Sequence, residues 1–183
     1  AATTFSELVT YAMTPNFSHD GQYVAFTNQD SGSAKSLEWM RVDLTQSPPV
    51  FSNLEALTTA EGNVAAWPSF LPDSSGILFH DGERYDTQAG CNGPSYANVR
   101  MVDTATGDVI ALDRLNGRDD DGNFTLPFGE AEEANVDYEP TLLPVPVGGY
   151  YWVIFTSRRA YGNYLGPGGS AGGASKWGQC DPE

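Results

Sequence analysis

The chain has 183 residues, with 9 Lys and Arg against 24 Asp and Glu, which gives a formal net charge of −15. This acidic surplus excludes nucleic acid as a partner, because Lys and Arg bind the phosphate backbone, and it equally disfavours anionic membrane surfaces. No stretch approaches the roughly 18 apolar residues of a membrane span. The length and the 40% hydrophobic content fit one ordinary domain, or a piece of a larger repetitive one.

Three similar segments follow one another along the chain. Pro15–Phe26 and Pro68–Phe79 both place a Pro 11 positions before a Phe, with a turn containing Asp and Gly between two apolar runs. Pro140–Phe155 is a looser copy with a spacing of 15. Asp and Gly between short apolar runs are typical of a β-hairpin, so each segment predicts strand, turn, strand.

Two further strands are predicted after each of the first two hairpins. The third strands are predicted at residues 37–43 and 96–103, which alternate roughly between apolar and polar and contain Arg close before Val-Asp. After a turn, the fourth strands follow at residues 50–57 and 109–115. Four-stranded units that recur with loops of variable length are typical of propeller blades. The sequence therefore predicts an all-β partial β-propeller, with a sandwich of accidentally similar hairpins as the alternative.

The first repeat resembles a known family. Pro15-Asn16-Phe17-Ser18-His19-Asp20-Gly21, followed by the apolar run Tyr23–Phe26, is similar to the TolB-type, WD40-like β-propeller repeat. The third segment is similar to secreted propeller proteins of deltaproteobacteria. The resemblance covers about residues 14–163 and implies a propeller fold. It implies binding, scaffolding or, in chains fused to a hydrolase, control of substrate access.

The predicted domain spans residues 1–183, with blades at about 14–57, 67–115 and 138–183 and a Gly-rich loop at 166–173. A lone outer strand at 5–10 is also expected. Since a closed propeller has about 4–8 blades, the last blade and the ring are incomplete. We expect a protein partner, or the remainder of the same polypeptide, to complete the propeller.

The long predicted loops 28–36, 58–66, 81–95, 116–137 and 158–179 are expected on one face, with short turns on the other. Asp119, Asp120 and Asp121 in one loop and Trp177 in another are the candidate binding residues. Asp119 and Asp121 have the alternate spacing of calcium ligands before a Gly. However, position twelve of such a loop would be Phe128 rather than Glu. A solvated acidic turn is therefore the alternative to a calcium site.

No catalytic residue is predicted. Ser170 lies in a Gly-x-Ser-x-Gly pattern, but the Gly-rich surroundings lack the strand-to-helix elbow on which a nucleophile depends. The sequence favours a non-enzymatic binding or scaffold module, secreted or periplasmic, that presents an acidic loop-rich face to a protein or glycan partner. The alternatives are a propeller associated with a peptidase or glycan-active hydrolase, or a structural subunit of an extracellular assembly.

Cys91 and Cys180 are predicted to form a disulfide. Both fall in the loop between the second and third strands of consecutive blades, and these loops share a face. The secretory kinship implied by the resemblance fits an oxidising compartment, in which such a bond persists. The competing possibility is that Cys180 pairs with a residue beyond Glu183.

Overall fold

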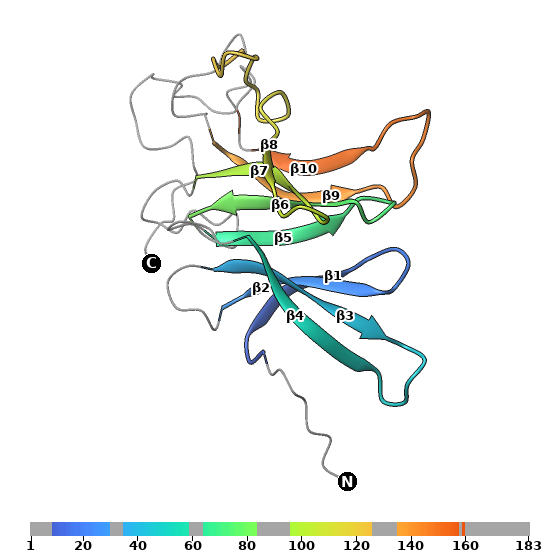
Figure 1. Cartoon of the computed structure of the whole chain (residues 1–183). Coiled ribbons are helices and arrows are strands. Elements are labelled where there is room, and N and C mark those ends of the chain that lie inside the picture. Colours follow the sequence, from blue (N-terminus) through green and yellow to red (C-terminus); the bar gives the residue numbers. More distant parts are fainter. Residues whose placement is uncertain are drawn as a thin grey trace, which may run out of the picture.

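Ten β-strands make up the regular structure of the computed structural model (Figure 1). The structure describes residues 9–29, 35–58, 64–83, 96–125, 135–157 and 159, and these residues contain no helix. The strands form three sheets of four, four and two strands, each with antiparallel neighbours. The chain is thus an all-β partial propeller with an incomplete third blade.

The strands follow chain order within each blade. The first blade contains β1 (Ala12–Phe17), β2 (Tyr23–Asn28), β3 (Ser36–Asp43) and β4 (Val50–Thr58). The second contains β5 (Val64–Phe70), β6 (Gly76–Gly82), β7 (Ala97–Asp103) and β8 (Val109–Ala111). The third contains β9 (Asp137–Leu142) and β10 (Val153–Ser157).

One predicted strand is shorter in the structure. The strand expected over 109–115 ends at Ala111, because the chain turns between Leu112 and Gly117. The Asn116 amide N–H bonds the Leu112 carbonyl at 2.9 Å, and Gly117 has a φ of +73°. Of the lone strand expected at 5–10, residues 9 and 10 are not in a strand and the remainder lies outside the described residues.

Every blade repeats the same irregularity in its first strand. Thr14, Trp67 and Glu139 each precede a Pro and have φ values of +49°, +56° and +52°. The pairing register shifts at the same place in all three hairpins. A left-handed backbone at a non-Gly residue before Pro is uncommon, so its triple occurrence confirms that the three segments are structural repeats.

The blades stack face to face in chain order, as Figure 1 shows. A core cluster with Ala25, Leu37, Ile77 and Phe79 joins the first blade to the second. A second cluster, with Leu78, Val99 and Leu142, joins the second blade to the third. Equivalent parallel bridges, Lys35 to Val64 and Ala97 to Val136, link the consecutive blades.

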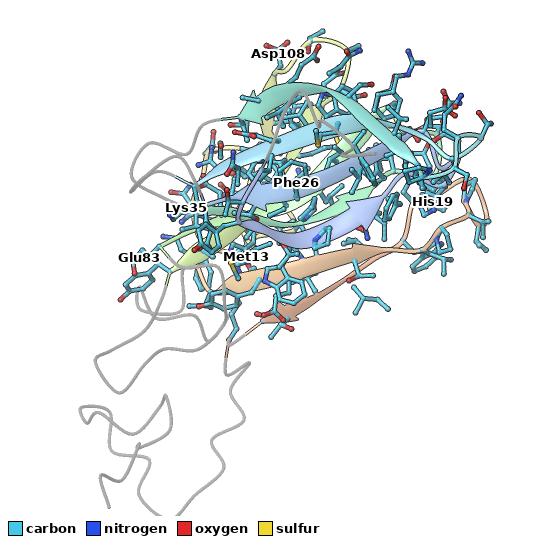
Figure 2. The ribbon with its side chains drawn as sticks, turned by 90° about the horizontal axis from the view of Figure 1, so that it is seen from below. Met13, His19, Phe26, Lys35, Glu83 and Asp108 are labelled. Carbon is cyan, nitrogen blue, oxygen red and sulfur yellow. The ribbon has the colours of Figure 1, made fainter. Side chains whose placement is uncertain are left out.

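The short hairpin turns lie together at one end of the blades. Figure 1 places the turns of the β1–β2, β3–β4, β5–β6 and β9–β10 hairpins at one end. Figure 2 accordingly shows His19, in the first hairpin turn, at one end and Lys35 and Glu83 at the other. The short turns therefore share one end as predicted, whereas most residues of the long loops lie outside the described residues.

Candidate interaction surface

The third blade exposes a face that the other two blades bury. Ala25, Leu78 and Ile154 are equivalent, because each precedes the Phe that ends the repeated spacing. Ala25 is 0% and Leu78 is 4% exposed, since the next blade covers each of them, whereas Ile154 is 78% exposed. The same difference is found two residues further along each strand, where the side chains point to the same face. Thr27 and His80 are fully buried, whereas Thr156 is exposed.

Large apolar side chains surround Ile154. Along β10, Val153 and Phe155 pack toward the second blade, so Trp152 and Ile154 point the other way. Leu143 pairs with Trp152 through its amide N–H, which bonds the Trp152 carbonyl at 2.9 Å. We call Leu143, Trp152 and Ile154 the open face; their exposed fractions are 42%, 56% and 78%.

The turn of this hairpin extends the apolar surface. Val145, Val147, Tyr150 and Tyr151 are all about half exposed or more. Two hydrogen bonds fix the geometry: the Trp152 indole N–H donates to the Val147 carbonyl at 3.1 Å, and the Tyr151 hydroxyl donates to the Asp73 carboxylate at 2.9 Å. The Asp73 bond anchors the turn to the second blade and raises the pKa of Tyr151.

The edge of β10 is also open. β2 lies between β1 and β3, and β6 lies between β5 and β7, but within the described ranges β10 pairs with β9 alone. An unpaired strand edge presents backbone amides and carbonyls to any extended chain that approaches it.

The opposite end of the stack is closed. On the outer side of the first blade, Val24, Phe26 and Met40 are 3–8% exposed, and Val9 and Leu54 pack against them. Figure 2 shows Phe26 from this side, among the packed side chains of the blade. The three described blades therefore have one apolar face that is covered and one that is bare.

Two carboxylates of the acidic loop are engaged by residues nearby in the sequence. The Asp119 carboxylate accepts hydrogen bonds from the backbone amides of Asp121 and Asn123 at 3.0 and 2.8 Å. The Asn123 bond contributes most to holding the pKa of Asp119 below its usual value. Asp120 forms a 2.6 Å ion pair with Arg114. In the part of the chain that the structure describes, no three His, Cys, Asp or Glu side chains form a group suited to a metal ion. The calcium site stays a prediction.

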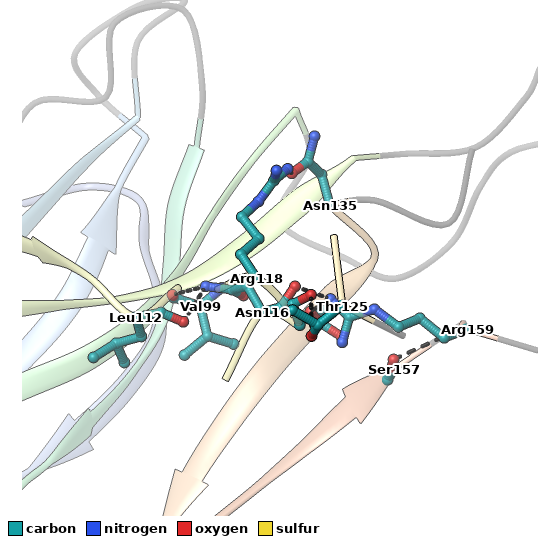
Figure 3. Close-up of polar contacts among 10 residues, drawn as sticks. Val99, Leu112, Asn116, Arg118, Thr125, Asn135, Ser157 and Arg159 are labelled. Atoms are coloured by element: carbon teal, nitrogen blue, oxygen red, sulfur yellow. Dashed lines mark hydrogen bonds and ion pairs between the residues drawn. The ribbon is translucent and has the colours of Figure 1, made fainter. Parts of the chain in front are cut away.

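A buried polar cluster holds this loop against the blades (Figure 3). The Asn116 side chain bonds both the amide and the carbonyl of Val99, at 2.9 and 2.8 Å. Arg159 donates to the Asn116 carbonyl and to the Asp137 carboxylate, and its guanidinium lies 5.6 Å from the centre of the Phe124 ring. Burial raises the pKa of Asp137, and the Arg159 charge opposes this shift.

Several predicted site residues lie outside the described residues. These are Trp177 and both cysteines of the predicted disulfide, Cys91 and Cys180. The open face was missed because Trp152 and Ile154 read as ordinary strand residues. The repeat itself held a signal, since the Pro-to-Phe alignment makes Ile154 equivalent to Leu78.

Comparisons with known proteins add no assignment. No protein-family model and no curated protein matches the chain. Among the described residues, no helix is long and apolar enough to cross a membrane.

Proposed function

We propose that this protein is a non-enzymatic binding or scaffold module of TolB type whose third blade binds a protein partner. The observation that carries the proposal is the 78% exposure of Ile154, at a position that is buried in both preceding blades. Contiguous exposed apolar groups mark interaction surfaces in soluble proteins. The three repeated left-handed residues before Pro support a propeller built from equivalent units.

The energetics of the open face favour a protein partner over a glycan. Full burial of a large apolar side chain contributes roughly 1.5–3 kcal/mol, and Trp is enriched among residues that dominate interface energies. Trp152 and Ile154 together offer such an anchor, with the exposed turn beside them. The net charge of −15 favours a partner that carries basic residues around this apolar contact.

The partner contact takes place in the secreted or periplasmic compartment under this proposal. Either a separate protein or the remainder of the same polypeptide supplies the covering surface. No cofactor is needed for this function, and the acidic loop with Asp119, Asp120 and Asp121 contributes to the negative charge of the protein rather than to the apolar contact.

A photo-crosslinking amino acid placed at position 154 tests this proposal in the native source of the protein. We expect an adduct with one defined protein partner, because the open face is covered in the functional assembly. Leu44, which is 60% exposed in a turn of the first blade, is the matched control position. The proposal is wrong if position 154 gives no more adduct than position 44.

A further inference from the structure

Two segments of the chain match the acceptor pattern for N-linked glycosylation, in which an Asn is followed two positions later by Ser or Thr. They are Asn16-Phe17-Ser18 and Asn123-Phe124-Thr125. The middle residue is Phe in both, so the pattern alone does not distinguish them. The surroundings of the two Asn side chains in the folded protein do distinguish them.

The second segment begins at the tip of a turn in the acidic loop. Residues 120–123 and Thr125 are all exposed. Apart from its chain neighbours, no atom lies within 4 Å of the position that a side-chain carbon on Gly122 would occupy, so the space beside Asn123 is open. The Asn123 side-chain amide donates a hydrogen bond to the Asp119 carboxylate at 3.3 Å. A long, solvent-exposed bond of this kind is readily exchanged for another partner.

The first segment is closed by its own hairpin. Asn16 lies within β1, where it pairs with Ala25 of β2. Ser18 is only 4% exposed, and its hydroxyl donates to the Asp20 carboxylate at 2.6 Å and accepts a hydrogen bond from the Tyr23 amide at 2.9 Å. A transferase must reach both the Asn amide and the hydroxyl of its acceptor. This segment therefore meets a transferase only if the hairpin opens.

We propose that Asn123 is an acceptor site for an N-linked glycan and that Asn16 is not. The Asn123 Nδ2 atom forms a bond to the anomeric carbon of a glycan carried on a lipid diphosphate. The bond between that carbon and the diphosphate oxygen breaks, the lipid diphosphate leaves, and one amide proton passes to a base of the transferase. No atom is oxidised or reduced. Such transfer takes place on secreted or periplasmic proteins, so this inference rests on the compartment named in the proposed function.

The middle residue of the acceptor segment anchors it to the protein. The Phe124 ring lies 5.6 Å from the Arg159 guanidinium, whereas Asn123 and Thr125 on either side of it are exposed. The segment is thus held through Phe124 while the two groups that a transferase recognises stay on the surface. In Figure 1 the yellow segment with residues 118–125 lies away from the β9–β10 turn. A glycan at Asn123 therefore projects from the acidic loop and leaves that turn open to a partner.

The test incubates the folded full chain with an oligosaccharyltransferase and a glycan on a lipid diphosphate, and then measures the intact mass. We expect the mass to increase by one glycan. An N-glycosidase should reverse this increase and leave an Asp in place of the modified Asn, so that peptide sequencing locates the site. Asn123→Gln should abolish the mass increase, whereas Asn16→Gln should leave it unchanged.

Two variants of Thr125 separate recognition of the acceptor from effects on the turn. Thr125→Ser keeps the hydroxyl and should keep the modification, whereas Thr125→Val keeps the shape of the side chain and should abolish it. A mass increase that persists in Asn123→Gln overturns the inference. So does a folded chain that stays unmodified, whether or not a free peptide of residues 118–126 is modified in parallel. The crosslink at position 154 does not depend on this result, so the proposed function is tested separately.

Discussion

At the scale of single residues, one buried ion pair fixes the loop end of the molecule. The side chains of Asp137 and Arg159 are 0% and 2% exposed. Removing both charges from water is unfavourable, and each charge compensates for the other inside the protein. Asn116 and Phe124 complete the surroundings of the guanidinium, so this pair joins the acidic loop to the third blade.

Replacing Arg159 should destabilise the fold strongly. Arg159→Met leaves the Asp137 carboxylate buried without its partner, and we expect the free energy of unfolding to fall by roughly 3 kcal/mol in urea denaturation. Arg114→Met is the matched control, since its ion pair with Asp120 is 75–80% exposed and should contribute below about 1 kcal/mol. Equal losses in the two variants would contradict the structural role of the buried pair.

Such a pair lies beyond local sequence analysis. Asp137 and Arg159 are 22 positions apart, and only the return of β10 along β9 brings them together. The sequence places Asp137 in an acidic stretch and gives no sign of its burial. Asp119 was different: its spacing to Asp121 and Gly122 indicated a turn, and the structure shows that its carboxylate closes that turn.

At the scale of elements, aspartates build the turns between strands. In five turns an Asp carboxylate accepts a hydrogen bond from the amide two residues later, at 2.8–3.1 Å. A nearby hydroxyl, followed by this amide, lowers the pKa of Asp20, Asp43 and Asp73. For Asp103 and Asp119, the backbone amides of Thr106 and Asn123 are the first cause of a lowered pKa. The five residues are Asp20, Asp43, Asp73, Asp103 and Asp119. Five of the 24 acidic residues therefore stabilise turns of the fold.

Acid should destabilise the protein through these turns. A lowered pKa means that the ionised carboxylate stabilises the folded state, so this stability is complete above about pH 4 and is lost as the pH falls through the folded-state pKa. We expect the melting temperature to drop as the pH falls from about 4 to about 2. Asp103→Asn keeps an oxygen that can accept the turn bonds but removes the titration, so it should make this drop smaller.

Asp108 provides the comparison for that experiment. It lies in the same turn region, and its carboxylate accepts none of the turn bonds found among the described residues. Asp108→Asn should therefore leave the pH dependence of the melting temperature unchanged. If Asp103→Asn and Asp108→Asn behave alike, the turn bonds do not account for the acid sensitivity.

The strands were predictable because their signals are local. Apolar alternation and Asp-Gly turns located the hairpins and the third strands to within a residue or so. The left-handed residues Thr14, Trp67 and Glu139 were not predicted, since a residue before Pro is usually extended. Their conformation depends on the bulge and on the packing of neighbouring first strands, which no local pattern encodes.

At the scale of the whole molecule, charge and apolar surface oppose each other. The open face favours association, whereas the net charge of −15 keeps copies of the chain apart. Salt weakens the second effect without weakening the first. The screening length falls from about 30 Å at 0.01 M to about 3 Å at 1 M ionic strength.

Raising the salt concentration should therefore promote self-association through the open face. We expect the weight-average mass in sedimentation experiments to be that of a monomer at low salt and to rise at 1 M NaCl. The mass rises because salt screens the repulsion between the negatively charged copies. Ile154→Asp should keep the chain monomeric at both salt concentrations. Salt-dependent association that persists in this variant would show that another surface is responsible.

The parallel bridges between blades have a consequence for how the molecule comes apart. Each bridge joins the start of one blade's third strand to the start of the next blade's first strand, at Lys35–Val64 and at Ala97–Val136. Detaching the third blade breaks one such joint, whereas detaching the second breaks two. The first and third blades have one joint each. In a linear array with nearest-neighbour coupling, the stack therefore frays from the end whose outer face is less covered. We therefore expect the third blade to open first, and a partner bound to its open face would also oppose the unravelling of the whole array.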